Sequence, residues 1–283
     1  MLDTSMTLPD GRVLAYTDCG AADGPLVIYF HGAPTSRLDL VGLDESFRSL
    51  GVRVVSPDRP GYGGSTPQLG RSWNDWPDDV SALAKHLGVK RFGVMGLSSG
   101  GPYAVACAAL LRDNVASAGV VAGTTDMSWP DAWKDYAEDE ATMMRLGNEA
   151  AAVGWCEEHY GRDGSKFFEA AGEMAPADMA LLEDEATASG FFATVGEAFR
   201  QGVGGFAQDI TVQARPWSFD PEAITAPTWI LHGDADPLVP PAHGRHTAEL
   251  IPGATLVTLP GHGHLSTLTE IPQLCVDLVA PLR

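Results

Sequence analysis

The sequence predicts an α/β protein with a mostly parallel central sheet and helices on both faces. Two observations predict this class. Short apolar runs recur along the 283 residues, and each ends near Gly, Pro or Asp. Segments with helical periodicity lie between these runs, and alternation of strand and helix is typical of a parallel sheet. A chain of this length can form one large domain that carries a modest insertion.

The predicted strands are continuous apolar runs, which indicates that both of their faces are buried. They are residues 26–30, 52–56, 92–95, 118–122, 228–231 and 255–259. The clearest predicted helices are residues 75–87, 102–111, 242–250 and 271–282. An opening hairpin is expected over residues 6–17, because Pro9-Asp10-Gly11 is a turn signal between two short extended segments.

The alternation stops between about Met127 and Arg215, where the chain is rich in Ala, Glu and Met and shows no convincing strand pattern. We therefore expect a core domain of residues 1–126 and 216–283 and a helical cap insertion of residues 127–215 over the sheet edge. Large apolar residues of the insertion could line a substrate pocket or form helix core. They are Trp129, Trp133, Met143, Met144, Trp155, Phe191 and Phe192.

Charge and hydropathy exclude several classes of partner. The chain has 37 Asp and Glu against 18 Lys and Arg, a formal net charge of −19, which disfavours nucleic acid and anionic lipid as ligands. We interpret this acidity as a well-solvated surface. The start of the chain lacks a signal-peptide pattern, and the apolar runs are far shorter than the roughly 18 residues of a membrane span. A cytoplasmic protein with no membrane association is expected.

The cysteines give no sign of a metal or redox site. Cys19, Cys107, Cys156 and Cys275 are far apart, with neither CxxC spacing nor clustered histidines. We expect reduced, buried thiols, and we predict no cofactor and no metal.

The sharpest motif is Gly96-Leu97-Ser98-Ser99-Gly100-Gly101, between a predicted strand and the helix that starts at Pro102. It matches the Gly-x-Ser-x-Gly pattern of a nucleophilic serine on a tight strand-to-helix turn, where small neighbours avoid clashes. The start of the helix favours negative charge at the same place. A plain Gly- and Ser-rich turn is the alternative, but the strand before and the helix after favour Ser98 as nucleophile. Ser99 competes with it, although its main-chain N–H is more useful as an oxyanion donor.

A nucleophilic serine needs a base, and the base needs a third group to orient it. Two segments that follow predicted strands supply such groups. Gly233-Asp234-Ala235-Asp236 follows the strand 228–231, and Gly261-His262-Gly263-His264 follows the strand 255–259. Ligands collect at the carboxyl edge of such sheets, so both segments are expected near the serine.

Together these motifs resemble the α/β-hydrolase superfamily, and the resemblance covers nearly the whole chain, from the strand at Leu26 to the last helix. The order Ser, Asp, His along the chain is the one this fold uses. In relatives the acid commonly stands three residues beyond the glycine, which implies Asp236. The base matches the last residue of the second segment, which implies His264.

Three other residues remain alternatives for these two roles. Asp126 follows the preceding strand, from which some members of the superfamily take their acid. Asp234 could also be the acid, and its simpler interpretation is a carboxylate that caps a turn. His262 could be the base, or a residue that supports it, or part of an ordinary loop.

Two further loops match the superfamily. Phe30-His31-Gly32-Ala33-Pro34 resembles its His-Gly oxyanion loop, which implies that the N–H of Ala33 joins that of Ser99 in holding an oxyanion. We interpret His31 as a structural residue of this loop. Residues 58–65 match a second loop, which we interpret as a tight turn pinned by Arg59 and Asp58. A nucleotide site is not predicted, because the GxGxxG spacing that opens a helix is missing.

The identity of the nucleophile selects the chemistry that the resemblance implies. Related dehalogenases and epoxide hydrolases use an aspartate at this place, whereas a serine indicates acyl transfer. C–C hydrolases of the superfamily often have Asn before the serine, and Leu97 differs from that. We therefore expect an esterase that cleaves a small-molecule ester of a small or medium apolar acid through an acyl-enzyme on Ser98. C–C or amide hydrolysis, cofactor-free peroxidation and a non-catalytic ligand-binding role are the alternatives.

Overall fold

The computed structural model describes residues 2–136, 138–169 and 174–283. An eight-stranded sheet with the strand order β1-β2-β4-β3-β5-β6-β7-β8 forms its centre. The strands are β1 (Leu2–Thr7), β2 (Val13–Gly20), β3 (Leu26–Phe30), β4 (Arg53–Pro57), β5 (Phe92–Leu97), β6 (Val115–Val121), β7 (Thr228–Gly233) and β8 (Thr255–Leu259). β2 pairs antiparallel with β1 and β4, and the strands from β4 to β8 are parallel. The predicted mostly parallel α/β sheet is confirmed.

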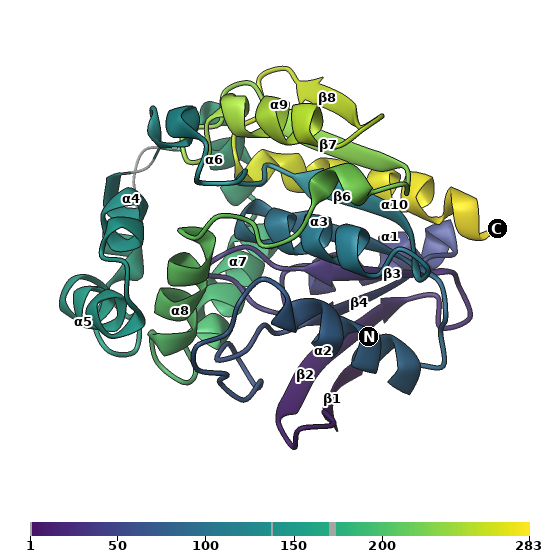
Figure 1. Ribbon diagram of the computed structural model, residues 1–283, viewed down its shortest axis with the longest axis horizontal. Coiled ribbons are helices and arrows are strands. Elements are labelled where there is room, and N and C mark those ends of the chain that lie inside the picture. The colour runs from purple at the N-terminus through teal and green to yellow at the C-terminus, as the bar shows by residue number, and fades with distance from the viewer. Residues whose placement is uncertain (1, 137, 170–173) are drawn as a thin grey trace.

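Helices cover both faces of this sheet (Figure 1). They include α1 (Asp44–Leu50), α2 (Asp75–His86), α3 (Gly101–Leu110), α9 (Pro241–Leu250) and α10 (Ile271–Val279). Alternate residues of β3 point to the two helical layers on opposite faces of the sheet. Ile28 and Phe30 pack in one buried cluster with α2 and α3, and Val27 and Tyr29 pack in another with α1 and α10. This two-residue alternation explains why the strand is apolar at every position.

The last strand corrects one expectation. Residues 255–259 were predicted to be buried on both faces, but Thr255, Leu256 and Thr258 are exposed. The reason is that β8 ends the sheet and pairs on one side with β7 alone. A short apolar run does not reveal by itself whether a strand is central or at an edge.

Between β6 and β7 the chain forms a helical segment, residues 130–213. Its main helices are α4 (Glu138–Arg145), α5 (Glu149–Tyr160), α6 (Pro176–Leu182), α7 (Glu185–Ala198) and α8 (Gly204–Gln213). In Figure 1 α4, α5 and α8 lie together at one side of the molecule. Residues 137 and 170–173 of the predicted insertion lie outside the described residues. The division into a core domain and a cap insertion of residues 127–215 stays our proposal.

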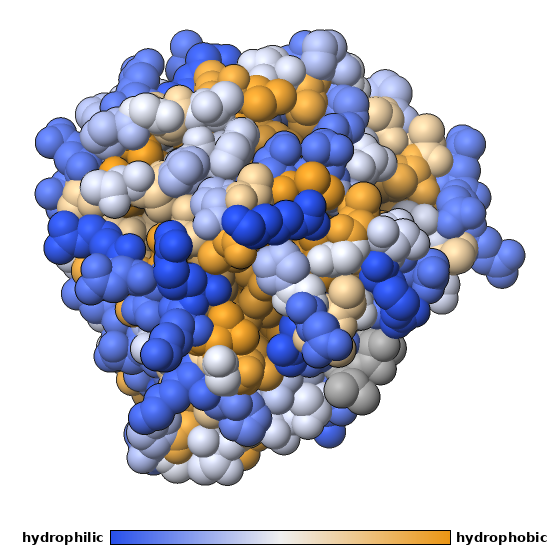
Figure 2. Space-filling model, turned by 90° about the vertical axis from the view of Figure 1, so that its right-hand side faces the viewer, coloured by the Kyte–Doolittle hydropathy of each residue, from blue (hydrophilic) through white to orange (hydrophobic). Residues whose placement is uncertain are grey.

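The molecular surface carries both hydrophilic and hydrophobic residues. Figure 2 shows the side of the molecule away from α4 and α5, where hydrophilic residues surround a band of hydrophobic ones. Cys19, Cys107, Cys156 and Cys275 are buried free thiols, as predicted. Within the described residues, none of the helices combines the length and the apolar character that a membrane span requires.

Candidate active site

Ser98 stands directly after β5, at the start of the turn that leads into α3. Its φ angle is +53°, which lies in the left-handed region that residues other than glycine rarely adopt. A Cβ on Gly96 would overlap the carbonyl oxygen of Gly100, and a Cβ on Gly100 would overlap the carbonyl oxygen of Phe30. The turn therefore requires glycine at both positions. Strained backbone of this kind persists only where its surroundings hold it in place, and it is frequent at functional sites.

Asp236 and His264 lie in the loops that follow β7 and β8, and the structure joins them. Nδ1 of His264 is 2.7 Å from Oδ2 of Asp236, and both side chains are buried. The other carboxylate oxygen accepts the N–H groups of Leu238 at 2.9 Å and Val239 at 3.0 Å. These bonds fix the carboxylate, so that its second oxygen is directed at the imidazole ring.

The electrostatics of Asp236 keep it ionised. Burial by itself would raise the pKa of this carboxyl, but the nearby imidazole of His264 and the hydrogen bonds outweigh burial. The net pKa of Asp236 is below its ordinary value. An ionised carboxylate on Nδ1 orients an imidazole and stabilises its protonated form.

The alternative acids have other partners. Asp234 accepts the N–H of Gly261 at 2.7 Å, which is the turn-capping role of its simpler interpretation. Asp126 accepts main-chain N–H groups on both carboxylate oxygens, from Ser128 at 2.9 Å and Trp217 at 3.3 Å. The structure thus uses these two carboxylates to hold loops.

The two other histidines near this region differ in their surroundings. Nδ1 of His262 lies 3.2 Å from the carbonyl oxygen of Pro260, and the residue is only partly buried. His232, which sequence reasoning did not single out, is buried with Nε2 2.9 Å from the carbonyl oxygen of Val239 and 3.6 Å from Oδ2 of Asp236. Burial lowers the pKa of His232, so a neutral ring lies beside the carboxylate.

The loop after β3 lies against the serine. A Cβ on Gly32 would be 3.5 Å from the Cβ of Ser98. Arg59 donates to the carbonyl oxygens of His31 and Gly32, the latter at 3.0 Å, and Nδ1 of His31 lies 2.7 Å from the same Gly32 oxygen. The C=O and N–H of a trans peptide point in opposite directions. The N–H of Ala33 therefore points away from Arg59.

Arg59 corrects the interpretation of residues 58–65 as a turn pinned by Arg59 and Asp58. Asp58 does hold the turn, since it accepts the N–H of Gly64 at 2.9 Å, but its ion pair is with Arg37, at 2.7 Å. Arg59 pairs with Asp209 of α8, at 2.7 Å, and both side chains are fully buried. Burial favours this pairing because a guanidinium inside the protein needs a directly bonded counter-charge. Nothing local in the sequence indicated a partner 150 residues away.

Asp209 is the centre of a larger buried cluster. Arg71 and the hydroxyl groups of Tyr62 and Tyr103 also donate to its carboxylate, the two tyrosines at 3.2 and 2.6 Å. Burial alone would raise the pKa of Asp209, but the charges of Arg59 and Arg71 outweigh it, and the net pKa is far below the ordinary value. Helix α8 is thereby tied to the core next to the loop after β3.

The large apolar residues of the helical segment are mostly packed among themselves. Met143 and Met144 are buried in a cluster of this segment. Trp129 stacks on His246 with ring centroids 4.1 Å apart. Phe192 is 54% exposed. The helix-core interpretation therefore holds for the two methionines.

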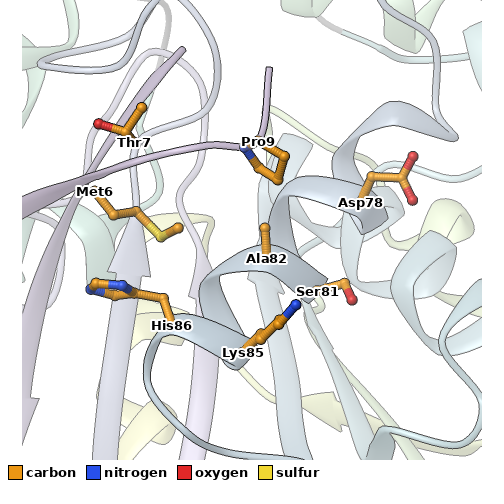
Figure 3. Close-up of a pocket in the computed structure, with 8 residues that line it drawn as sticks. All are labelled: Met6, Thr7, Pro9, Asp78, Ser81, Ala82, Lys85 and His86. Atoms are coloured by element: carbon orange, nitrogen blue, oxygen red, sulfur yellow. The ribbon is translucent and has the colours of Figure 1, made fainter. Parts of the chain in front are cut away.

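One hollow on the surface has no connection with these residues. It lies between the first hairpin and α2, and Figure 3 shows Met6, Pro9, Ala82, Lys85 and His86 around it. The predicted site residues are not part of its lining. Among the described residues, no group of three His, Cys, Asp or Glu side chains is placed to hold a metal ion.

Comparison with known proteins agrees with this architecture. Residues 25–271 match the model of the alpha/beta hydrolase fold family. The chain is 29% identical to a bifunctional esterase/perhydrolase from Acinetobacter calcoaceticus over 98% of its length and 99% of that protein. It is 27% identical to a non-heme chloroperoxidase from Streptomyces lividans over 98% of both.

A solved structure shows the same agreement in three dimensions. A thermophilic esterase from Thermogutta terrifontis superimposes with a TM-score of 0.66 and 25% identity, over 99% of this chain and 98% of that one. The predicted α/β-hydrolase fold is confirmed, and homologous esterases are among its relatives. The chain belongs to the α/β-hydrolase fold family.

Proposed function

We propose that this protein is a carboxylesterase-like serine hydrolase with Ser98 as nucleophile, His264 as base and Asp236 as the acid that orients the base. The observation that carries the proposal is the left-handed backbone of Ser98 at +53° on a turn that only small neighbours allow. The 2.7 Å contact between His264 and Asp236 supports it. The three residues follow β5, β7 and β8, whose carboxyl ends meet at one edge of the sheet.

In the proposed reaction, Oγ of Ser98 attacks the ester carbonyl carbon while Nε2 of His264 takes the hydroxyl proton. The tetrahedral intermediate collapses, the C–O bond breaks, and His264 gives the proton to the departing alcohol. Water then attacks the acyl-enzyme with His264 again as base, which releases the acid and restores Ser98. Asp236 stabilises the imidazolium that forms in both steps.

The oxyanion of each intermediate is held by the N–H groups of Ala33 and Ser99. Arg59 holds the carbonyl oxygen of Gly32 on its own side, which turns the N–H of Ala33 the other way, and Gly32 itself lies beside Ser98. Loss of one such donor typically costs about 2.7–4 kcal/mol of transition-state stabilisation. His31 serves the loop as a structural residue.

The helical segment covers Ser98 as a cap in this proposal, and the substrate is a small-molecule ester of a small or medium apolar acid. Support comes from its position in the chain after β6 and from its partly buried aromatic residues Trp133, Trp155 and Phe191. Apolar linings with few polar groups are typical of sites for such ligands.

Perhydrolysis is a second candidate activity on the same residues. Two of the relatives are a bifunctional esterase/perhydrolase and a non-heme chloroperoxidase. In this reaction hydrogen peroxide replaces water: its oxygen attacks the acyl carbon, His264 takes the proton, and the products are a peracid and free Ser98. The intermediate is the same acyl-enzyme, so both activities require the same nucleophile.

The test is turnover of p-nitrophenyl esters of increasing acyl length, with amide and C–C substrates beside them, by the wild type and Ser98→Ala. We expect kcat to fall by about 10⁶-fold in Ser98→Ala, because nucleophile and base act as a unit. Ser218→Ala, at an exposed serine, is the control and keeps full activity. Added peroxide should yield peracid with the wild type only. Ester turnover that survives in Ser98→Ala rejects the proposal.

A further inference from the structure

Helix α6 places one carboxylate on the loop that carries His264. Asp178 accepts the main-chain N–H of His264 at 2.8 Å through one oxygen. Its other oxygen accepts the N–H of Ser266 at 2.7 Å and the hydroxyl of Ser266 at 2.6 Å. Asp178 is 1% exposed, so these three bonds are formed away from water. Charged acceptors make hydrogen bonds about twice as strong as neutral ones.

The loop itself is built around these bonds. The hydroxyl of Ser266 also accepts the N–H of Gly263 at 2.9 Å, and Thr267 donates to the carbonyl oxygen of His264 at 2.6 Å. A Cβ on Gly263 would overlap the carboxylate of Asp178 and the Cβ of Ala175. The lack of a side chain at Gly263 therefore lets the side chains of Ala175 and Asp178 lie directly against the loop.

We propose that Asp178 is a positioning residue for His264, and that the proposed hydrolase has a competent base only while α6 is seated on this loop. Asp236 fixes the imidazole ring at Nδ1, and Asp178 fixes the main chain from which the ring projects. Both are needed, because a ring anchored at one end can still turn about the Asp236 contact. This inference rests on the proposed function of Ser98 and His264.

The inference gives the helical segment a part in catalysis beyond covering the substrate. A displacement of α6 would take Asp178 away from the N–H groups of His264 and Ser266, and the approach of Nε2 to Oγ of Ser98 that the proposed function requires would be disturbed. A misplacement of about 1 Å in such a group can lower the rate about 10²-fold.

The test compares Asp178→Asn with Asp184→Asn. Asp184 also lies in the helical segment and accepts main-chain and hydroxyl bonds, from Thr187, but at an exposed helix start. We expect Asp178→Asn to lower kcat for a good ester about 10²-fold with KM changed by less than about threefold. The rate of Ser98 labelling by a fluorophosphonate should fall by a similar factor. Asp184→Asn should keep both rates within about twofold.

Two further measurements separate positioning from folding. The downfield proton resonance of the His264–Asp236 hydrogen bond should broaden or disappear in Asp178→Asn, while the circular dichroism spectrum stays that of the wild type. Gly263→Ala should reproduce the loss of kcat with Asp178 intact, because the added Cβ pushes α6 away. If Asp178→Asn does not fold, Ser266→Ala replaces it and should give a smaller loss in the same direction.

The results distinguish this inference from the proposed function. Wild-type kcat in folded Asp178→Asn, together with an inactive Ser98→Ala, would overturn the positioning role and leave the nucleophile in place. An unchanged downfield resonance in Asp178→Asn would also overturn it. A wild type that neither turns over esters nor labels at Ser98 would reject the proposed function itself.

Discussion

The two halves of the helical segment are held in different ways. In the inner half, α6 to α8, each helix bonds a core loop through a buried polar side chain. Asp178 holds the His264 loop, Thr194 accepts the N–H of Ser36 at 3.0 Å, and Asp209 pairs with Arg59. In the outer half, α4 and α5, the buried side chains are mainly apolar and pack on α8.

The two halves therefore differ in how firmly their positions are fixed. Hydrogen bonds and ion pairs depend on direction, so the inner half has one seated position. Apolar contacts are non-directional, and Met in particular adapts to irregular spaces. We infer that, in the proposed hydrolase, the inner half sets the geometry of His264 and of the loop after β3, whereas the outer half contributes mainly apolar packing.

The largest change in the free energy of unfolding is expected for a substitution in the inner half. Asp209→Ala leaves Arg59 and Arg71 buried without their carboxylate, which should lower the free energy of unfolding by about 3–5 kcal/mol. Urea denaturation measures it. Glu197→Gln is the control on α7, because its ion pair with Arg37 is partly exposed and should contribute less than about 1 kcal/mol. Equal losses of unfolding free energy in the two variants would contradict the claim that Asp209 holds α8 on the core.

A substitution in the apolar core of the outer half should lower the stability of the protein but leave kcat unchanged. Met143 is buried at 1% exposure and contacts Cys156, with their sulfur atoms 3.3 Å apart. Met143→Ala should lower the free energy of unfolding by about 2 kcal/mol or more, because it leaves a cavity. Its kcat should stay within about twofold of the wild type. A fall in kcat like that of Asp178→Asn would remove the distinction between the halves.

Acid should loosen the point where the helical segment leaves the core. Nδ1 of buried His243 accepts the N–H of Thr125 at 3.2 Å, and its Nε2 lies 2.9 Å from the carbonyl oxygen of Ala132, which describes a neutral ring. Burial lowers the pKa of His243 from 6.5 to about 4.

The unfolded chain therefore binds more protons between these two values, so this contribution to stability is complete above about pH 6.5 and is lost as the pH falls toward 4. The slope that His243 gives to the free energy of unfolding against pH is at most about 1.4 kcal/mol per pH unit. His243→Gln should flatten it in urea titrations at pH 7, 6 and 5. An unchanged slope would assign the acid sensitivity to other groups.

The smallest effect is expected at α7. Thr194→Val removes the hydroxyl that accepts the N–H of Ser36 and donates to Oδ1 of Asp39, and should lower the free energy of unfolding by about 1 kcal/mol. Thr187→Val, at a partly buried threonine of the same helix whose hydroxyl donates to the exposed Asp184, is the matched control and should change it by less than about 0.5 kcal/mol. The difference between the two variants measures the buried hydrogen bonds of the Thr194 hydroxyl as a group.

Much of the fold could be predicted because its signals are local. The parallel strands were visible as apolar runs, and the turn at Ser98 was visible because Gly96 and Gly100 stand two residues on either side. The exposed position of β8 could not be predicted, since it depends on the order of strands in the sheet.

The contacts that hold the site were the hardest part to predict. Asp178 lies 86 residues from His264, and Asp209 lies 150 residues from Arg59. Each is one acid in a helix-forming stretch, and sequence alone does not distinguish it from a solvated surface acid such as Asp184. Asp236 was selected by resemblance, and its contact with His264 appears only in three dimensions.

The central claim, that Ser98 is the nucleophile, is tested most directly by peptide mass mapping after a brief reaction with a fluorophosphonate. The account predicts one adduct on the peptide that holds Ser98, formed far more slowly in His264→Ala and absent in Ser98→Ala. An adduct on another residue, or equal labelling of the Ser98 peptide in the wild type and His264→Ala, would contradict it.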